Sequence, residues 1–208
     1  AVTAAQIADD AISEEHLDVT AITGHTAETS IADGDTLLIH DASASALRKM
    51  TKANFVSGIG GANTPAFFVE LNGSQSSVSD DTFTKVAYNN EEFDTANAFD
   101  SSTNYRFTTP SDGAGKYVFF AQVDVDSEGN SNLDNSTFQF KKNNSVIRSQ
   151  EYNHLSNPPR NHAVFSTILE SMSAGDYMEI FVRIEASDAS GGRFNGTNTW
   201  FGGYKIIE

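Results

Sequence analysis

The residues best suited to chemistry form an acidic run, DVDSEGN, at positions 124–130. Asp124, Asp126, Glu128 and Asn130 place oxygen ligands at alternate positions, and a glycine stands where a sharp turn is needed, as Ca²⁺ binding requires. The position expected to hold a bidentate glutamate is Asn135 instead, and no helices are expected beside the run. The sequence therefore allows a Ca²⁺ site here, and a polar connection between two strands is the alternative.

A second group of residues could bind a ligand through hydrogen bonds. Three long polar connections are expected, at Asp126–Asn135, Asn153–His162 and Ser187–Asn198. Loops supply ligand contacts more often than strands, whose backbone groups are committed to the sheet. For a surface polysaccharide, the predicted contact residues are Tyr152, His154, Arg160, Arg193 and Asn195. The alternative for each is a solvated loop position.

Enzyme chemistry finds little support. The sequence has no G-x-S-x-G nucleophile motif, no phosphate-binding loop and no H-E-x-x-H zinc motif. It has no cysteine, which excludes disulfides and thiolate metal sites, and its five histidines are scattered. Carboxylate pairs carry no weight among 28 acidic residues. We expect no enzyme, and a polysaccharide depolymerase is the less favoured alternative.

The net charge of the chain limits the classes of partner that it can bind. The formal net charge is −15, so a nucleic-acid backbone or an anionic membrane surface would be repelled. No apolar run approaches the roughly 18 residues of a membrane span. The first ten residues lack the basic and apolar regions of a secretory signal, so we expect no signal peptide there. The sequence predicts neither nucleic-acid binding nor membrane insertion.

Aromatic residues are distributed unevenly, and this divides the chain. The chain has 15 Phe, 6 Tyr and 1 Trp, yet Phe55 is the only one of these within residues 1–62. The first part therefore cannot build a large core from its own side chains. We expect it to be extended or packed against other chains.

Residues 1–29 form the predicted leader, which is extended or partly helical. Apolar residues recur every five positions in it: Val2, Ile7, Ile12, Leu17 and Ile22. A spacing of five drifts around a helix and alternates faces on a strand, so neither element alone buries these residues together. An assembly of three extended chains could bury them, and a short helix is the alternative.

Residues 30–61 are expected to form a small hairpin-plus-helix unit. Asp33-Gly34 is a turn signal, residues 36–40 are a strand, and residues 47–50 could pair back. Thr51 could cap a short helix at residues 52–57. Residues 62–65 then form a linker.

From residue 66 to 208 the pattern changes to strands separated by turn residues. Strands are expected at 66–71, 82–88, 105–108, 116–126, 137–142, 145–150, 163–171, 177–186 and 199–207. Asn143-Asn144 is a hairpin signal. One face of the strand at 116–126 is continuously apolar, with Tyr117, Phe119, Ala121, Val123 and Val125. The fold class is therefore mainly β, an antiparallel jelly-roll sandwich of about eight to ten strands.

Four ordered segments in this β region resemble the complement globular-head and tumour-necrosis-factor superfamily. They are Phe93-Asp94 with Phe99-Asp100, the stretch YRFT…GAGKYVF at 105–119, Leu169 with Gly175-Asp176, and TWFGGY at 199–204. The resemblance covers residues 66–207 and implies a ten-stranded jelly roll that forms a compact trimer. The collagen-like stalk that precedes some such heads is not found here.

The front of the chain is similar to segments of tailed-phage fibres, in the stretch QIADDAIS and in ADGDTLLIHDASASALRKMT. Together the two resemblances imply a homotrimer, a leader docked on other virion proteins, and an exposed tip. We therefore expect a structural virion fibre, on the tail or the head of the particle, that contacts a host glycan or protein. A secreted complement-like or cytokine-like module is the alternative. Trp200 would then be a core or trimer-axis aromatic, or a platform for a sugar.

Overall fold

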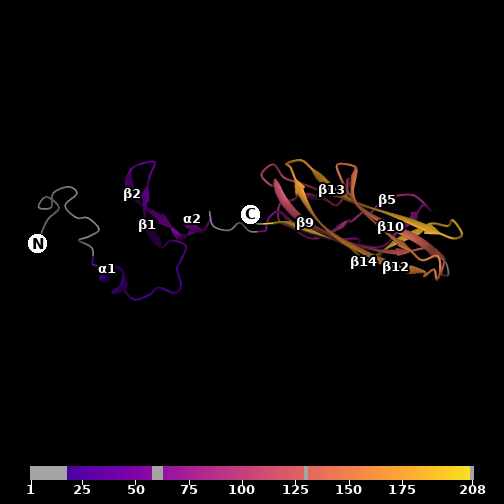
Figure 1. The fold of residues 1–208 in the computed structure, drawn as a ribbon, viewed down its shortest axis with the longest axis horizontal. Helices are drawn as coiled ribbons and strands as arrows, with labels where there is room; N and C mark the ends of the chain where they lie inside the picture. Colours follow the sequence, from indigo (N-terminus) through magenta and orange to yellow (C-terminus); the bar gives the residue numbers. More distant parts are fainter. Residues whose placement is uncertain (1–17, 58–62, 129–130, 207–208) are drawn as a thin grey trace, which may run out of the picture. The chain divides into compact units, whose positions relative to one another are not determined.

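The computed structural model describes residues 18–57, 63–128 and 131–206. The chain divides into two compact units, residues 1–59 and residues 60–208, which are called the front unit and the head below. Most of the predicted repeat, from Val2 to Leu17, lies outside the described residues. Figure 1 shows the elements of each unit.

The front unit contains the predicted hairpin and helix, together with a short helix in the predicted leader. Its elements are α1 (Thr20–Thr23), β1 (Thr36–Asp41), β2 (Ala46–Thr51) and α2 (Lys52–Ser57). β1 and β2 pair antiparallel, from Thr36 opposite Thr51 to Asp41 opposite Ala46. The hydroxyl of Thr51 accepts a hydrogen bond from the amide of Asn54 at 3.3 Å, so the predicted helix cap is confirmed.

The head is a sandwich of two six-stranded sheets, seen as an upper and a lower layer in Figure 1. The β10 sheet has the order β11-β10-β13-β8-β7, with β5 also on β13. Its strands are β5 (Thr84–Lys85), β7 (Phe99–Asp100), β8 (Arg106–Thr108), β10 (Leu133–Lys142), β11 (Ser145–Asn153) and β13 (Tyr177–Ala186).

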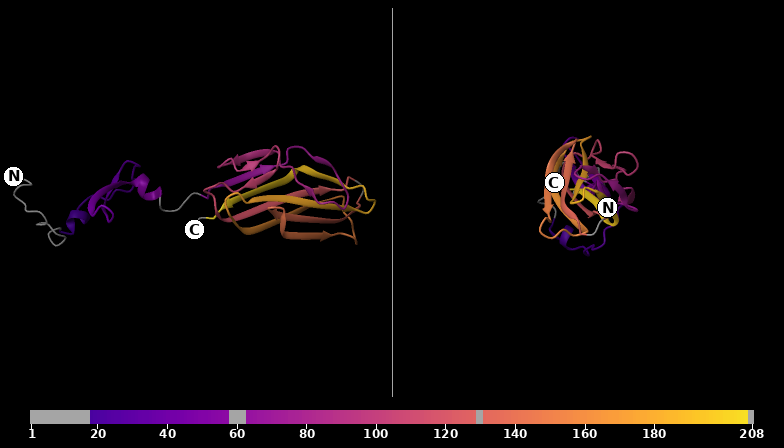
Figure 2. Two further views of the ribbon diagram at one scale, coloured as in Figure 1. Left: turned by 90° about the horizontal axis from the view of Figure 1, so that it is seen from above. Right: turned by 90° about the vertical axis from the view of Figure 1, so that its right-hand side faces the viewer.

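The β9 sheet has the order β12-β9-β14-β3-β6, with β4 also on β14. Its strands are β3 (Ala66–Glu70), β4 (Gln75–Val78), β6 (Asn90–Asp94), β9 (Gly115–Asp126), β12 (Asn161–Met172) and β14 (Gly192–Lys205). The strand pairs within both sheets are antiparallel, and the long strands run along the head (Figure 2). The predicted fold class is confirmed.

The core lies between the two sheets and is rich in aromatic rings. The five side chains predicted to share one face of β9 are all fully buried: Tyr117, Phe119, Ala121, Val123 and Val125. Phe67 of β3 stacks on Phe107 of β8 with 4.8 Å between ring centroids, and its ring meets Phe201 of β14 edge-on at 5.0 Å. Such ring pairs add to the free energy gained by burying the rings.

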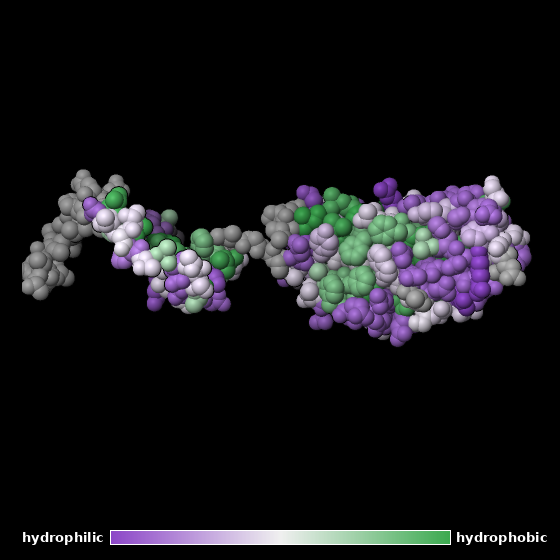
Figure 3. Space-filling view, turned by 90° about the horizontal axis from the view of Figure 1, so that it is seen from below, coloured by the Kyte–Doolittle hydropathy of each residue, from purple (hydrophilic) through white to green (hydrophobic). Residues whose placement is uncertain are grey.

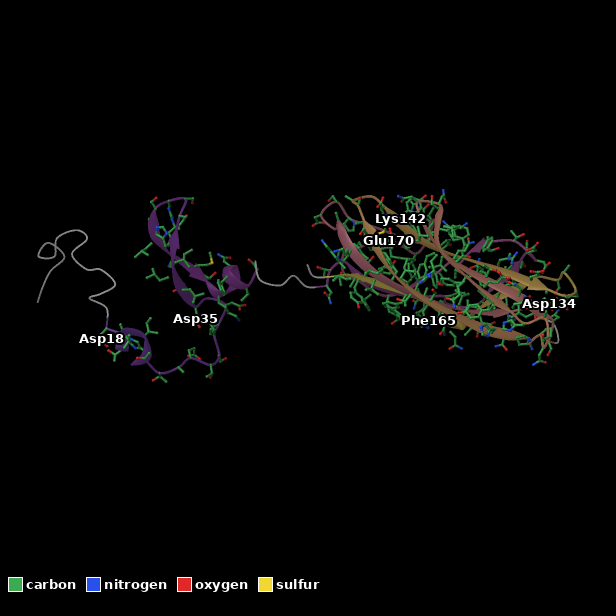
Figure 4. The ribbon with its side chains drawn as sticks, viewed as in Figure 1. Asp18, Asp35, Asp134, Lys142, Phe165 and Glu170 are labelled. Atoms are coloured by element: carbon green, nitrogen blue, oxygen red, sulfur yellow. The ribbon has the colours of Figure 1, made fainter. Side chains whose placement is uncertain are left out.

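Ion pairs also join the two sheets at the edge where β10 and β12 lie (Figure 4). The ammonium of Lys142 on β10 lies 3.2 Å from Glu170 on β12 and 3.2 Å from Asp176. Burial alone would lower the pKa of Lys142, but these two carboxylates outweigh burial and raise it. Lys142 therefore stays charged and holds the β10–β11 hairpin against the second sheet.

Several predicted segments differ in extent from the observed strands, and one of them is the loop expected at Asn153–His162, because β12 begins at Asn161. The strand expected at 82–88 is only β5, whereas β6 and β7 lie in a stretch expected to be loops. The connection expected at Asp126–Asn135 ends early, because β10 begins at Leu133. The loop expected at Ser187–Asn198 contains the first half of β14. In the segments that begin β10 and β14, pairing with neighbouring strands outweighs the low strand preference of the glycines and asparagines.

Candidate functional site

Asp126 of the predicted calcium run meets two of the predicted ligand residues, Arg160 and Arg193, at one end of the head. Asp126 is 3% exposed. Its oxygens lie 3.2 Å from Nε of Arg160 and 2.8 Å from Nη2 of Arg193. Two guanidinium groups therefore compensate the charge of this buried carboxylate.

These contacts also set the protonation of Asp126. Burial alone would raise its pKa, but the hydrogen bond from the amide of Glu128 and the pairing with Arg160 and Arg193 outweigh burial and lower it. Asp126 is thus a permanent anion at neutral pH, neutralised from within the head.

The arrangement disfavours the calcium site predicted from DVDSEGN. Asp124 and Asp126 belong to β9, where same-face side chains stand roughly 7 Å apart and do not converge as they do in a loop. Glu128 lies 3.3 Å from Nη1 of Arg193, and Asn130 lies outside the described residues. Within residues 18–57, 63–128 and 131–206, no three His, Cys, Asp or Glu side chains lie together as potential metal ligands.

Arg193 and Asn195 were predicted to lie in a loop, and this is wrong, because both belong to β14. The Nε of Arg193 donates to the amide oxygen of Asn195 at 2.9 Å. Arg193 also contacts Asp126 and Glu128, so its guanidinium is engaged in bonds within the head. Arg160 keeps a side chain that is 53% exposed, so it is the better placed of the two arginines for a ligand.

Tyr152 and His154 form a separate cluster with His162. The ring of His162, on β12, lies 5.0 Å from that of Tyr152 and 4.8 Å from that of His154. The hydroxyl of Tyr152 donates to the carbonyl of Phe165 at 3.2 Å. Tyr152 and His154 therefore help to close the side of the sandwich between β11 and β12.

The histidines of this cluster are poorly solvated. The Nε2 atoms of His154 and His162 are buried and have no hydrogen-bond partner. Burial lowers the pKa of His162, the charge of His154 lowers it further, and Asp124 opposes both effects. The cluster therefore favours a neutral His162.

A surface that the ligand predictions missed covers the outward face of the β9 sheet. Strand pairing places three rows of side chains across this face. In the central row Phe93, Phe68, Gly202, Phe120 and Thr167 stand opposite one another. The row on one side has Ala66, Tyr204, Val118 and Leu169, and the row on the other has Glu70, Trp200, Gln122 and Phe165.

The apolar and aromatic members of these rows are called the aromatic face: Phe68, Phe93, Val118, Phe120, Phe165, Leu169, Trp200 and Tyr204. Their rings are in contact, with centroids 5.9 Å apart for Phe68 and Trp200 and 5.8 Å apart for Phe165 and Trp200. Phe93 is 52% exposed and Leu169 is 62% exposed. Figure 3 shows hydrophobic side chains gathered on this side of the head, and Figure 4 labels Phe165 there.

Gly202 lies at the centre of the aromatic face. A Cβ atom at this position would lie 2.6 Å from Cε2 of Phe120 and 3.0 Å from Cδ2 of Phe68. The missing side chain thus lets two rings close over the strand, which makes the face continuous.

One sequence signal could have revealed the aromatic face. The segment YVFF at 117–120 is apolar at four successive positions. An antiparallel strand with one face in water should alternate between apolar and polar residues. Its uninterrupted apolar run therefore indicates a strand that is covered on both faces.

Comparisons with known proteins support the fold but not a family. No protein-family model and no curated protein match the sequence. Among solved structures, the Eiger TNF of S. frugiperda is similar, with a TM-score of 0.50 and 17% identity over 68% of this chain and 91% of that one. This likeness shows that the head has a jelly-roll fold of the same kind.

Two further structures have lower TM-scores. The globular domain of the zebrafish complement 1qA protein has a TM-score of 0.47 and 17% identity, over 69% of this chain and 98% of that one. Murine APRIL at pH 5.0 has a TM-score of 0.49 and 11% identity, over 68% of this chain and 98% of that one.

None of the helices within the described residues has the length and hydrophobicity to cross a membrane.

Proposed function

We propose that this chain is the subunit of a homotrimeric fibre of a tailed-phage virion, with the head as an exposed tip that binds the host surface. The observation that carries the proposal is the aromatic face, an outward sheet surface that holds aromatic rings in contact with one another and an exposed leucine. A contiguous apolar patch of this kind marks an interaction site.

The aromatic face is suited to association with copies of the same chain. Fully burying a Leu or Phe side chain stabilises a structure by about 1.5–3 kcal/mol. Phe93, Phe165 and Leu169 are each about half exposed in the single chain, so covering them contributes several kcal/mol by the same scale. The resemblance of residues 66–207 to a superfamily of compact trimers favours a threefold arrangement.

The polar end of the head suits contact with a host molecule. The outward face of β9 changes from Val118 and Phe120 to Asp124 and Asp126 along the strand. Arg160 offers an exposed guanidinium at that end, and a guanidinium group matches the geometry of a carboxylate, such as that of an acidic glycan. We expect Arg160→Ala to reduce adsorption to the host, and unchanged adsorption would reject this contact.

The virion role is supported by the similarity of the front of the chain to tailed-phage fibres. A secreted complement-like or cytokine-like module is the second candidate, and it is consistent with the same fold. Gold-labelled antibody against the head separates the two. Label on fibres of purified particles supports the virion role, whereas label found only in the particle-free medium favours the secreted module.

A pair of matched variants tests the aromatic face. Leu169→Asp places a charge in the face, and Leu155→Asp changes a leucine of similar exposure, 65% against 62%, in the connection between β11 and β12. We expect Leu169→Asp to shift the purified protein from trimer to monomer in mass photometry and Leu155→Asp to stay trimeric. Equal behaviour of the two variants would contradict the assignment of this face.

A further inference from the structure

Within residues 18–57, the described part of the front unit, the surface is hydrophobic and no residue is buried. None of the residues of α1, β1, β2 and α2 is buried. Eight large apolar side chains of this unit are exposed: Val19, Ile22, Ile31, Leu37, Leu38, Leu47, Phe55 and Val56. A fold with all of these in water gains little from the hydrophobic effect, which is the main force that stabilises folded chains.

Part of this surface is hollowed. Ile31, Leu37, Phe55 and Val56 line a groove between the hairpin and α2. A backbone hydrogen bond joins the start of the hairpin to the start of α2 beside this groove. The amide of Lys52 donates it to the carbonyl of Asp35, labelled in Figure 4, at 2.8 Å. The apolar floor of the groove is therefore built by the chain, and none of the residues that the structure describes covers it.

The hairpin also has unpaired edges. In the part of the chain that the structure describes, β1 and β2 form a sheet of two strands with no third strand. A two-stranded hairpin is at best marginally stable in water, and its free backbone groups are a template for pairing with another strand. The exposed apolar side chains and the unpaired backbone groups of the hairpin thus both favour contact with another chain.

The charge of residues 30–57 indicates which kind of partner they bind. Residues 30–57 contain three acidic and three basic residues, Asp33, Asp35, Asp41, Arg48, Lys49 and Lys52, although the whole chain carries −15. Two of the opposite pairs already meet, with 3.1 Å between Arg48 and Asp41 and 2.8 Å between Lys52 and Asp33. Copies of residues 30–57, in which the charges cancel, do not repel one another through these residues, unlike copies of an acidic surface.

We propose that residues 30–57 bind the same residues of the other chains in the trimer, so that the hairpins and the groove cover one another. The inference rests on the proposed function for the number of copies. Heads that associate hold their front units at an effective concentration in the millimolar range, by the usual estimate for short linkers. A weak contact between the units is therefore enough to order them.

The absence of cysteine from the chain allows a clean test by cross-linking. Leu38→Cys in the full-length chain places a thiol on the hairpin at a residue that is 73% exposed, and Leu155→Cys places one on the head at a residue that is 65% exposed. With a short bismaleimide at dilute protein concentration, we expect Leu38→Cys to give linked chains and Leu155→Cys to stay unlinked. Leu47→Cys, at 68% exposure, serves as a second hairpin position.

Hydrogen exchange on the unmodified trimer supplies an independent readout, and we expect the amides of residues 36–51 to be protected. If mass photometry shows a trimer but the hairpin thiols stay unlinked and these amides exchange freely, the inference is overturned and the proposed function stands. Linking to a different protein in particle extracts, in place of a second copy, overturns it as well. A monomeric full-length chain overturns both.

Discussion

At the scale of single residues, two adjacent glycines of β14 serve the two faces of one sheet. A Cβ atom at Gly202 would press on Phe120 and Phe68 of the aromatic face, whereas one at Gly203 would lie 2.6 Å from Cδ1 of Phe119 in the core. An added methyl group should therefore disturb association at position 202 and the fold at position 203.

We expect Gly203→Ala to lower the free energy of unfolding by about 1–3 kcal/mol, as overpacked cores do. Gly202→Ala should spare the fold, because the ring end of Phe120 can move outward, but it should weaken the trimer. Chemical denaturation and concentration-dependent mass measurements read out the two effects. A larger loss of folding stability in Gly202→Ala than in Gly203→Ala would contradict the assignment of the faces.

His162 makes the head sensitive to mild acid. Its pKa is lowered from the usual 6.5 in the folded head, so as the pH falls the unfolded chain takes up this proton first. The contribution of neutral His162 to stability is complete above about pH 6.5 and is lost as the pH falls through the lower folded pKa. His154, Tyr152 and Asp124 are the groups around it.

We therefore expect the thermal midpoint of the wild-type head to fall more between pH 7.5 and pH 5.5 than that of His162→Gln. Circular dichroism at the two pH values measures this difference, and His25→Gln, at an exposed position of the front unit, is the control that should keep the wild-type dependence. A parallel decline in His162→Gln would show that other groups cause the acid sensitivity.

Sequence reasoning identified several residues that do meet in space but missed how they are used. Asp126 and Arg193 are 67 positions apart in the chain, and no local pattern shows that one neutralises the other. Loop-like composition around Arg193 concealed a strand. The candidate calcium and sugar-binding residues were therefore predicted as free groups, although Asp126 and Arg193 largely satisfy each other.

At the scale of elements, the long strands were the most predictable, because alternation of apolar residues directly reflects burial on one face. The first half of β14 was not, since its glycines and asparagines disfavour strands. Gly196 shows why they are needed there: a Cβ atom would lie 2.3 Å from the carbonyl oxygen of Gly73. The tight approach of two backbones is a tertiary property that local composition does not reveal.

The β10–β11 hairpin offers a test at this scale. Asn143 and Asn144 have φ values of 49° and 66°, as a two-residue turn of type I′ requires. Asn144→Val should lower the free energy of unfolding by about 1–2 kcal/mol, because a β-branched residue is strained in the left-handed region. Asn144→Gly should leave it unchanged or slightly higher.

Thermal unfolding of the two variants measures this difference, which corresponds to a lowering of the midpoint by roughly 2–8 °C for Asn144→Val at this size. Ser145→Val, at the exposed first position of β11, is the matched control and should change little. Equal midpoints for Asn144→Val and Asn144→Gly would contradict the turn type.

At the scale of the whole molecule, the two units share one property, which is apolar surface that the described residues of a single chain leave exposed. In the front unit the sequence predicted it, through the scarcity of aromatic residues before Phe55. In the head, such a surface was expected only from the resemblance to trimers, and the aromatic face is where it lies. The proposed trimer accounts for both surfaces.

The mass of the purified 208-residue chain in solution tests the proposed trimer most directly. One chain has a mass of 22.4 kDa, and we expect a folded particle of three times that mass that persists on dilution to nanomolar concentration. A folded monomer whose β9 sheet keeps its aromatic side chains in water would contradict it.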